Sequence, residues 1–211
     1  GREVEAELRR MRELFLRWNP STTMKCAIFE ENGNRHDMQR VLGHVTLQNA
    51  VRRMGDFVLT SCAANALQPY RQNDNGWDQG QVFFTPSQVW GMPPYYAQQM
   101  AAAHHRPLTV GCGVEGADGV LDVTATRSRE AGSVVLHIAN TGAEPLRVGL
   151  RVDGMGKVSQ ARMVSLSGDL DAVNTPEEPR RIAPVGRELP AWAAQTVDIA
   201  PYSYTIVVLD E

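Results

Sequence analysis

The feature that most constrains the fold is a change of periodicity near residue 107. Before this point, helical stretches alternate with short apolar runs, and after it only short strands and turns follow. Strands separated by helical crossovers pair in parallel, whereas closely spaced strands joined by turns pair antiparallel. The sequence therefore predicts an α/β region over residues 1–106 and an all-β region over residues 107–211.

The α/β region contains only two long strand patterns with a helical crossover between them. In chain order the periodicity predicts a helix, a doubly buried strand, a helix and a strand, over residues 4–18, 24–29, 38–54 and 57–60. A short strand and a helix that opens at Pro93 and Pro94 follow, over residues 81–84 and 93–103. Two parallel strands cannot close a barrel, which takes about 250 residues. We therefore expect a piece of a larger α/β domain.

The all-β region shows alternation of apolar and polar residues between turn signals. The alternating segments are residues 121–125, 134–138, 146–150 and 205–209, with a weaker one at 163–166. Short strands at roughly ten-residue spacing are typical of an antiparallel β-sandwich.

Charge and composition exclude several classes of partner. The net charge is −3, so neither a basic field for nucleic acid nor a polybasic membrane face is expected. Cys26, Cys62 and Cys112 form no disulfide framework. The first two lie in apolar runs and are expected to be buried thiols, which slightly favours a cytoplasmic over a secreted location. No cofactor or metal site is expected, because no phosphate-binding glycine loop or complete ligand set appears.

The sharpest chemical feature is a strand that ends in acid. The apolar run over residues 24–29 continues directly into Glu30, Glu31 and Asn32. In barrel enzymes catalytic groups stand at the carboxyl ends of strands, where a carboxylate can attack an anomeric carbon. A solvated acid pair that opens a loop is the alternative.

Neutral polar and aromatic residues add a weaker indication. Asn65, Gln68 and Tyr70 follow the second strand, where they suit sugar hydroxyls but also an ordinary loop. Four aromatic residues could stack on a sugar or pack between the two regions; they are Trp77, Trp90, Tyr95 and Tyr96.

Three separated segments resemble glycoside hydrolase family 51. Residues 80–100 (GQVFFTPSQVWGMPPYYAQQM) resemble the stretch that joins the barrel of that family to its last helix. Residues 163–184 (MVSLSGDLDAVNTPEEPRRIAP) are similar to its C-terminal signature, Asn-Thr-x-Glu-x-Pro followed by a basic residue and a proline. Residues 200–205 (APYSYT) resemble its final turn and strand. The resemblance extends over nearly the whole chain beyond Met24.

The resemblance implies both a fold and an activity. The expected fold is the last βα units of a (β/α)8 barrel, incomplete in this chain, followed by a C-terminal jelly-roll β-sandwich. The expected function is that of a retaining, exo-acting α-L-arabinofuranosidase that releases terminal arabinofuranose from polysaccharides or oligosaccharides. The alternatives are a non-catalytic fragment, an accessory β-sandwich module, or an enzyme of the same fold that acts on β-glucan or a xyloside.

The resemblance also implies roles for individual residues. The family's nucleophile is a glutamate at the end of the seventh strand, followed by an aromatic residue, which assigns the role to Glu30. An acid stands where the aromatic residue is expected, so Glu31 is a competing assignment. Gln68 matches a glutamine that binds the furanose, and Asn32 and Trp77 complete the expected substrate-binding residues.

The family's general acid/base follows its fourth strand, and no such segment exists in this sequence. The expected partners are therefore the N-terminal part of the barrel, possibly in another chain, and an arabinose-containing glycan. A homo-oligomer is also expected from the family. The chain on its own is expected to be inactive.

Overall fold

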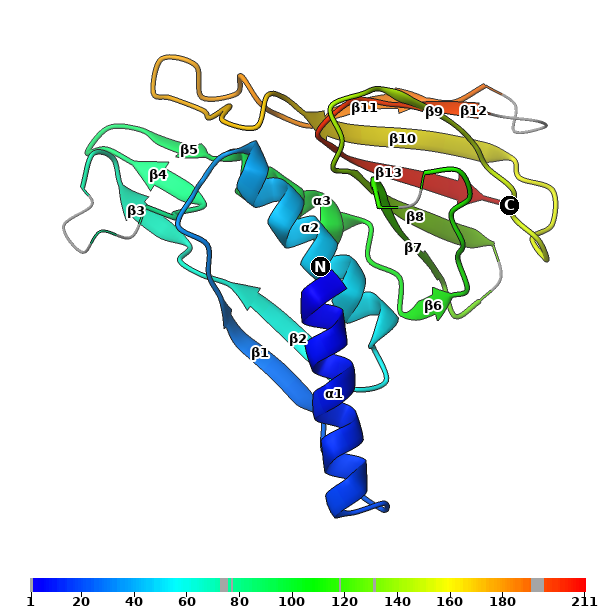
Figure 1. Ribbon diagram of the computed structural model, residues 1–211. Helices are drawn as coiled ribbons and strands as arrows, with labels where there is room; N and C mark the ends of the chain where they lie inside the picture. Colours follow the sequence, from blue (N-terminus) through cyan, green and yellow to red (C-terminus); the bar gives the residue numbers. More distant parts are fainter. Residues whose placement is uncertain (1, 73–75, 77, 118, 131, 191–195) are drawn as a thin grey trace.

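The computed structural model describes residues 2–72, 76, 78–117, 119–130, 132–190 and 196–211. It shows a mixed arrangement of helices and sheets in which most strand pairs are antiparallel (Figure 1). The helices α2 and α3 lie between the largest sheet and the short strands of the N-terminal half.

The N-terminal half begins with two helices and two strands that follow the predicted order. They are α1 (Arg2–Trp18), β1 (Cys26–Glu31), α2 (Met38–Arg53) and β2 (Val58–Ala63). β1 and β2 pair in parallel, as the helical crossover predicted. Asp37 caps α2, because its carboxylate accepts the backbone amide of Arg40 at 3.1 Å.

A small three-stranded sheet and a helix complete this half. The elements are β3 (Leu67–Pro69), β4 (Val82–Phe84), β5 (Val89–Gly91) and α3 (Pro93–Ala103). β3 pairs with β4 in parallel, and β4 pairs with β5 antiparallel. The prediction for β4 and α3 is confirmed, whereas β3 and β5 were not predicted.

The C-terminal half is built from antiparallel strands, as predicted. Its strands are β6 (Leu108–Val110), β7 (Leu121–Arg127), β8 (Ser133–Asn140), β9 (Leu146–Gly149), β10 (Gln160–Ser167), β11 (Val185–Glu188), β12 (Thr196–Ile199) and β13 (Ser203–Asp210). Six of them form one sheet in the order β11-β10-β13-β8-β7-β6, while β9 pairs with β12.

The central strand β13 of the six-stranded sheet is buried on both faces, whereas the edge strand β11 is exposed. On β13, Ile206 and Val208 belong to a core cluster with residues of α2 and α3. The alternate residues Val207 and Leu209 belong to a second cluster, which includes Val197 of β12. The sheet therefore joins the helices on one side to the β9–β12 pair on the other.

The β1–β2 pair is covered on one face. Cys26 and Ile28 pack in a cluster with residues of α1 and with Phe57. Phe29 is 80% exposed and Leu59 is 69% exposed. The prediction that this first strand is buried on both faces is therefore wrong for the chain in hand, because nothing in the described residues covers Phe29. Parallel sheets in proteins normally have both faces covered.

The cysteines also differ from expectation. All three thiols are free; Cys26 is half-buried, whereas Cys62 and Cys112 are exposed. The expected burial is wrong for Cys62, because β2 presents this residue away from the helices. Among the described residues, no helix is both long and apolar enough to cross a membrane.

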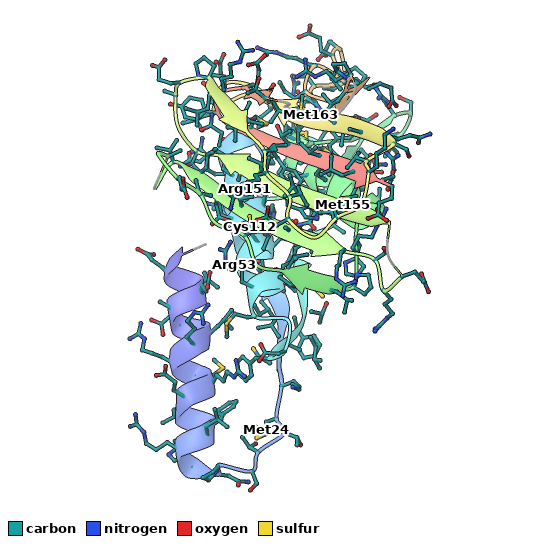
Figure 2. All side chains as sticks on the ribbon, turned by 90° about the vertical axis from the view of Figure 1, so that its right-hand side faces the viewer. Met24, Arg53, Cys112, Arg151, Met155 and Met163 are labelled. Carbon is teal, nitrogen blue, oxygen red and sulfur yellow. The ribbon has the colours of Figure 1, made fainter. Side chains whose placement is uncertain are left out.

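A charged link ties α1 to the C-terminal half. The Arg53 guanidinium donates to Glu5 of α1 at 2.7 Å and to Asp122 of β7 at 3.0 Å. In Figure 2 Arg53 lies between α1 and the strands of the C-terminal half, and Met24 lies near the end of α1 that is farther from those strands. The half-buried Arg53 thus connects the two halves through side chains as well as through the core.

Candidate functional site

The carboxyl end of β1 carries an irregularity that separates two adjacent carboxylates. Ile28 pairs with Ser61 and Glu31 pairs with Ala63, so a step of three residues on β1 faces a step of two on β2. One extra residue in one strand is the arrangement of a β-bulge, which re-aims side chains and is frequent beside active sites. Phe29 and Glu30 are exposed, whereas Glu31 is buried.

Glu31 faces the interior and is held by two elements. Its Oε1 contacts Nδ1 of His44 on α2, and its Oε2 accepts a hydrogen bond from Oγ of Ser61 on β2 at 2.7 Å. Glu31 is 6% exposed and His44 is 1% exposed. Burial alone would raise the pKa of the Glu31 carboxyl, but His44, Ser61 and the charge of Arg40 together lower it below its usual value. Glu31 is therefore an ionised, internally paired carboxylate.

Glu30 faces the open side and receives a single side-chain hydrogen bond among the described residues. Asn32 Nδ2 donates to Glu30 Oε1 at 3.1 Å. The Asn32 side chain is in turn oriented by Gln79, whose Nε2 donates to Asn32 Oδ1 at 2.9 Å. Gln79 is buried, and its Oε1 accepts the amide of Gly33 at 3.2 Å. A chain of amides thus leads from the interior to Glu30.

Gln68 lies in β3 and is buried beside the segment that contains Gln79. Its Oε1 accepts the amide of Gly80 at 2.8 Å, and its Nε2 donates to Asp78 Oδ1 at 3.0 Å. Gly80 is required by this close approach, since a Cβ there would lie 2.4 Å from the Cβ of Gln68. Both ends of the Gln68 amide are therefore engaged within the protein, and binding of a furanose by this residue stays a prediction.

The aromatic residues serve mainly as packing where they are described. Trp90 is buried against Phe83 and Tyr70, and Tyr96 is buried in the core between α3 and the sheet. The packing alternative is confirmed for Trp90 and Tyr96. Trp77, predicted to bind substrate, lies outside the described residues.

The signature segment over residues 163–184 joins the sheet to the candidate site. Its loop begins after β10, and Asn174 Nδ2 donates to the carbonyl of Gly91 on β5 at 2.8 Å. The Leu170 carbonyl accepts the amide of Gln39 at the start of α2 at 2.9 Å. The Pro176 carbonyl accepts Gln88 Nε2 at 2.8 Å. The loop therefore fixes the small sheet and the start of α2 relative to the C-terminal half.

Three residues of this site were not predicted from the sequence, namely His44, Ser61 and Gln79. The three residues lie outside the motifs and strand-end positions that supplied the candidates predicted from the sequence. In the described part of the chain, no group of three or more His, Cys, Asp or Glu side chains is arranged to hold a metal ion.

Comparison with known proteins places the chain in a family. Residues 19–203 match the model of the α-L-arabinofuranosidase C-terminal domain. No curated protein matches the chain.

Several solved structures share the fold. The MgGH51 α-L-arabinofuranosidase with bound arabinose is 21% identical, with a TM-score of 0.76 over 84% of this chain and 28% of its own. The Thermotoga petrophila RKU-1 family 51 enzyme is 18% identical, with a TM-score of 0.76 over 88% of this chain and 43% of its own. The Xanthomonas axonopodis pv. citri family 51 enzyme is 12% identical, with a TM-score of 0.75 over 98% of this chain and 45% of its own.

The chain therefore spans less than half the length of each of these enzymes. At these identities the likeness shows the shared fold, while the family model matches most of the chain. From these findings together, the chain belongs to the family of the C-terminal domain of glycoside hydrolase family 51 α-L-arabinofuranosidases.

Proposed function

We propose that this chain is the C-terminal part of a retaining, exo-acting α-L-arabinofuranosidase in which Glu30 is the nucleophile. In this proposal, residues 1–106, with α1 to α3, are the last units of a (β/α)8 barrel, and residues 107–211 are its C-terminal jelly roll. The observation that carries the proposal is the contrast between the two carboxylates at the end of β1. Glu31 is buried and paired, whereas Glu30 is exposed.

Accessibility favours Glu30 over Glu31. A nucleophile must bring an ionised oxygen to the anomeric carbon. Both oxygens of Glu31 already have partners inside the protein, on His44 and Ser61. Attack by Glu31 would first require those contacts to break, whereas Glu30 is exposed and oriented by Asn32.

The proposed reaction is a double displacement. A Glu30 oxygen forms a bond to the anomeric carbon while the bond to the leaving oxygen breaks, and a second carboxylic acid protonates that oxygen. The second group then takes a proton from water, whose oxygen attacks the same carbon and releases Glu30 with retained configuration. The two carboxyl groups must stand about 5–5.5 Å apart. The resemblance assigns the second one to the part of the barrel outside this sequence.

The exposed face of β1–β2 supports a partner that completes the barrel. Phe29 and Leu59 lie exposed on this parallel pair, and Trp18 on α1 is 72% exposed. Covering both faces of a parallel sheet is the usual arrangement. We infer that the rest of the barrel, in the same or another chain, packs on this face. The homo-oligomer expected from the family would form in addition to this packing.

The proposed substrate is a glycan with terminal arabinofuranose units. The solved relative with bound arabinose supports this class of sugar. Asn32, Gln68 and Trp77 are the residues that we expect to contact or surround the bound unit.

The test compares Glu30→Gln with Glu31→Gln in the complete enzyme, which contains this chain and the rest of the barrel. Turnover of an aryl α-L-arabinofuranoside should fall by several orders of magnitude for Glu30→Gln, as removal of a nucleophile does. If Glu31→Gln causes this loss while Glu30→Gln keeps turnover, the assignment is wrong by one residue.

Two further assays separate the alternatives. The chain on its own should not hydrolyse the same substrate, because it lacks the second carboxyl group. A complete enzyme that prefers xyloglucan or an aryl xyloside would replace the substrate assignment. A complete protein that hydrolyses none of these substrates would favour a non-catalytic role.

A further inference from the structure

We propose that Glu31 is a positioning residue, which, with His44 and Ser61, anchors the bulge of β1 so that the Glu30 carboxylate faces the open side. This inference rests on the proposed role of Glu30. It assigns a function to the acid that stands where the family pattern has an aromatic residue.

The Glu31 side chain links its own strand to two other elements. One carboxylate oxygen contacts His44 on α2, and the other accepts from Ser61 on the neighbouring strand. A carboxylate bound through both oxygens by different elements has little rotational freedom. The side chain therefore fixes the end of β1 against both α2 and β2.

The backbone that follows the Glu31 side chain is fixed by the same helix. Arg40 donates to the carbonyl of Glu31 at 2.9 Å and to the carbonyl of Asn32 at 2.7 Å. Arg40 and His44 are four residues apart on α2 and so lie on one face of it. α2 thus holds both the side chain and the main chain at this point.

The bulge explains why such an anchor is needed. The register joins Ile28 to Ser61 and Glu31 to Ala63, and it assigns no partner to Phe29 or Glu30. The direction of the Glu30 side chain is therefore not set by ladder pairing. It is set by the fixed points on either side, which are Ile28 in the apolar cluster and Glu31 in the polar one, together with the hydrogen bond from Asn32.

Burial makes the anchor strong and selective. His44 from α2 and Ser61 from β2 contact the Glu31 carboxylate, and Glu30 is adjacent to it in the chain. Arg40 from α2 binds the Glu31 backbone carbonyl and acts on the carboxylate through its charge. Removing His44 or Ser61 would leave the buried Glu31 charge without one of its partners. The arrangement therefore disfavours any conformation in which Glu31 turns outward.

The test uses Ser61→Ala, which removes one hydroxyl and leaves both carboxylates in place. In the complete enzyme, kcat on an aryl α-L-arabinofuranoside should fall about 10- to 100-fold with KM nearly unchanged, because a misplaced nucleophile slows the chemical step. Glu31→Gln should lower kcat at least as much. The matched control is Ser165→Ala, which removes a serine hydroxyl bonded to Thr205 in the six-stranded sheet, far from this cluster. It should leave kcat unchanged.

A second readout separates this inference from the proposed function. An aziridine shaped like arabinofuranose alkylates the nucleophile, and mass spectrometry identifies the labelled residue. Label on Glu30 with slower labelling of Ser61→Ala supports the inference. Label on Glu30 with kcat and labelling rate of Ser61→Ala and Glu31→Gln within twofold of the wild type overturns it and leaves the proposed function intact. Label on Glu31 or on any other residue overturns both.

Discussion

The two sheets of this molecule that matter most differ in how completely the chain covers them. The central strands of the six-stranded antiparallel sheet are buried on both faces, by α2 and α3 on one side and by the β9–β12 pair on the other. The parallel β1–β2 pair is packed on one face and open on the other, where Phe29 is 80% exposed. The two sheets therefore have different roles. The antiparallel half supplies the larger part of the buried core, and the candidate site lies on the β1–β2 pair, which is open on one face.

The largest expected effect on the free energy of unfolding comes from shortening a buried side chain of the six-stranded sheet. Ile206 is fully buried on β13 between the sheet and the helices. Ile206→Ala should lower the free energy of unfolding by about 4 kcal/mol, as large-to-small changes in cores do. Urea unfolding followed by circular dichroism measures it. A loss below about 1 kcal/mol would contradict the view that this sheet is the stabilising core.

The second effect concerns the buried pair on the open unit. His44→Phe keeps an aromatic ring at this position but leaves the Glu31 carboxylate without its main partner, which should cost about 3 kcal/mol. Urea unfolding at neutral pH measures this loss, and Glu5→Gln on the more exposed Glu5–Arg53 pair serves as a control with a smaller effect.

The same pair predicts a dependence on pH. The folded pKa of Glu31 is lowered, so its contribution to stability is present above the unfolded pKa and is lost as the pH falls through the folded pKa. The stability difference between the wild type and Glu31→Gln should therefore shrink as the pH is lowered below the pKa of an ordinary glutamate side chain. A difference that stays constant from neutral to strongly acidic pH would contradict the assignment of an ionised Glu31.

A third, smaller effect tests the link between the two halves. Asn174→Ala removes one hydrogen bond that ties the signature loop to Gly91 of β5 and two that hold the loop to its own Ile182, which should cost about 2 kcal/mol. Hydrogen exchange of β5 should accelerate at the same time. The exposed Asn65→Ala is the control, and equal exchange in both variants would show that the loop does not hold the small sheet.

The smallest effect should be found on the open face. Phe29→Ala should change the unfolding free energy of the isolated chain by less than about 0.5 kcal/mol, as exposed substitutions do. In the complete enzyme the same change should lower stability clearly more, because the side chain is then proposed to be buried. Equal effects in the two contexts would argue against a cover on this face.

These comparisons also show what the sequence could predict. The parallel pairing of β1 and β2 followed from a helix between two apolar runs, and the long antiparallel strands followed from alternation. Five strands of three or four residues were missed, namely β3, β5, β6, β11 and β12, whereas the equally short β4 and β9 were predicted. So short a segment contains too few alternations to reveal its period, and its pairing is decided by contacts from elsewhere.

The site was predicted in outline only. Adjacent glutamates after an apolar strand marked the place, but regular alternation cannot show an extra residue in the strand. The bulge determines that Glu31 turns toward His44, which lies 13 residues further along the chain. The amide chain through Gln79 likewise depends on contacts between distant segments.

The most direct test of the central claim is the identity of the residue that bears the covalent sugar intermediate. The complete enzyme is trapped with the arabinofuranose-like aziridine, digested and sequenced by mass spectrometry. The account predicts a single adduct on Glu30. An adduct on Glu31, or on a residue outside this segment, would contradict it.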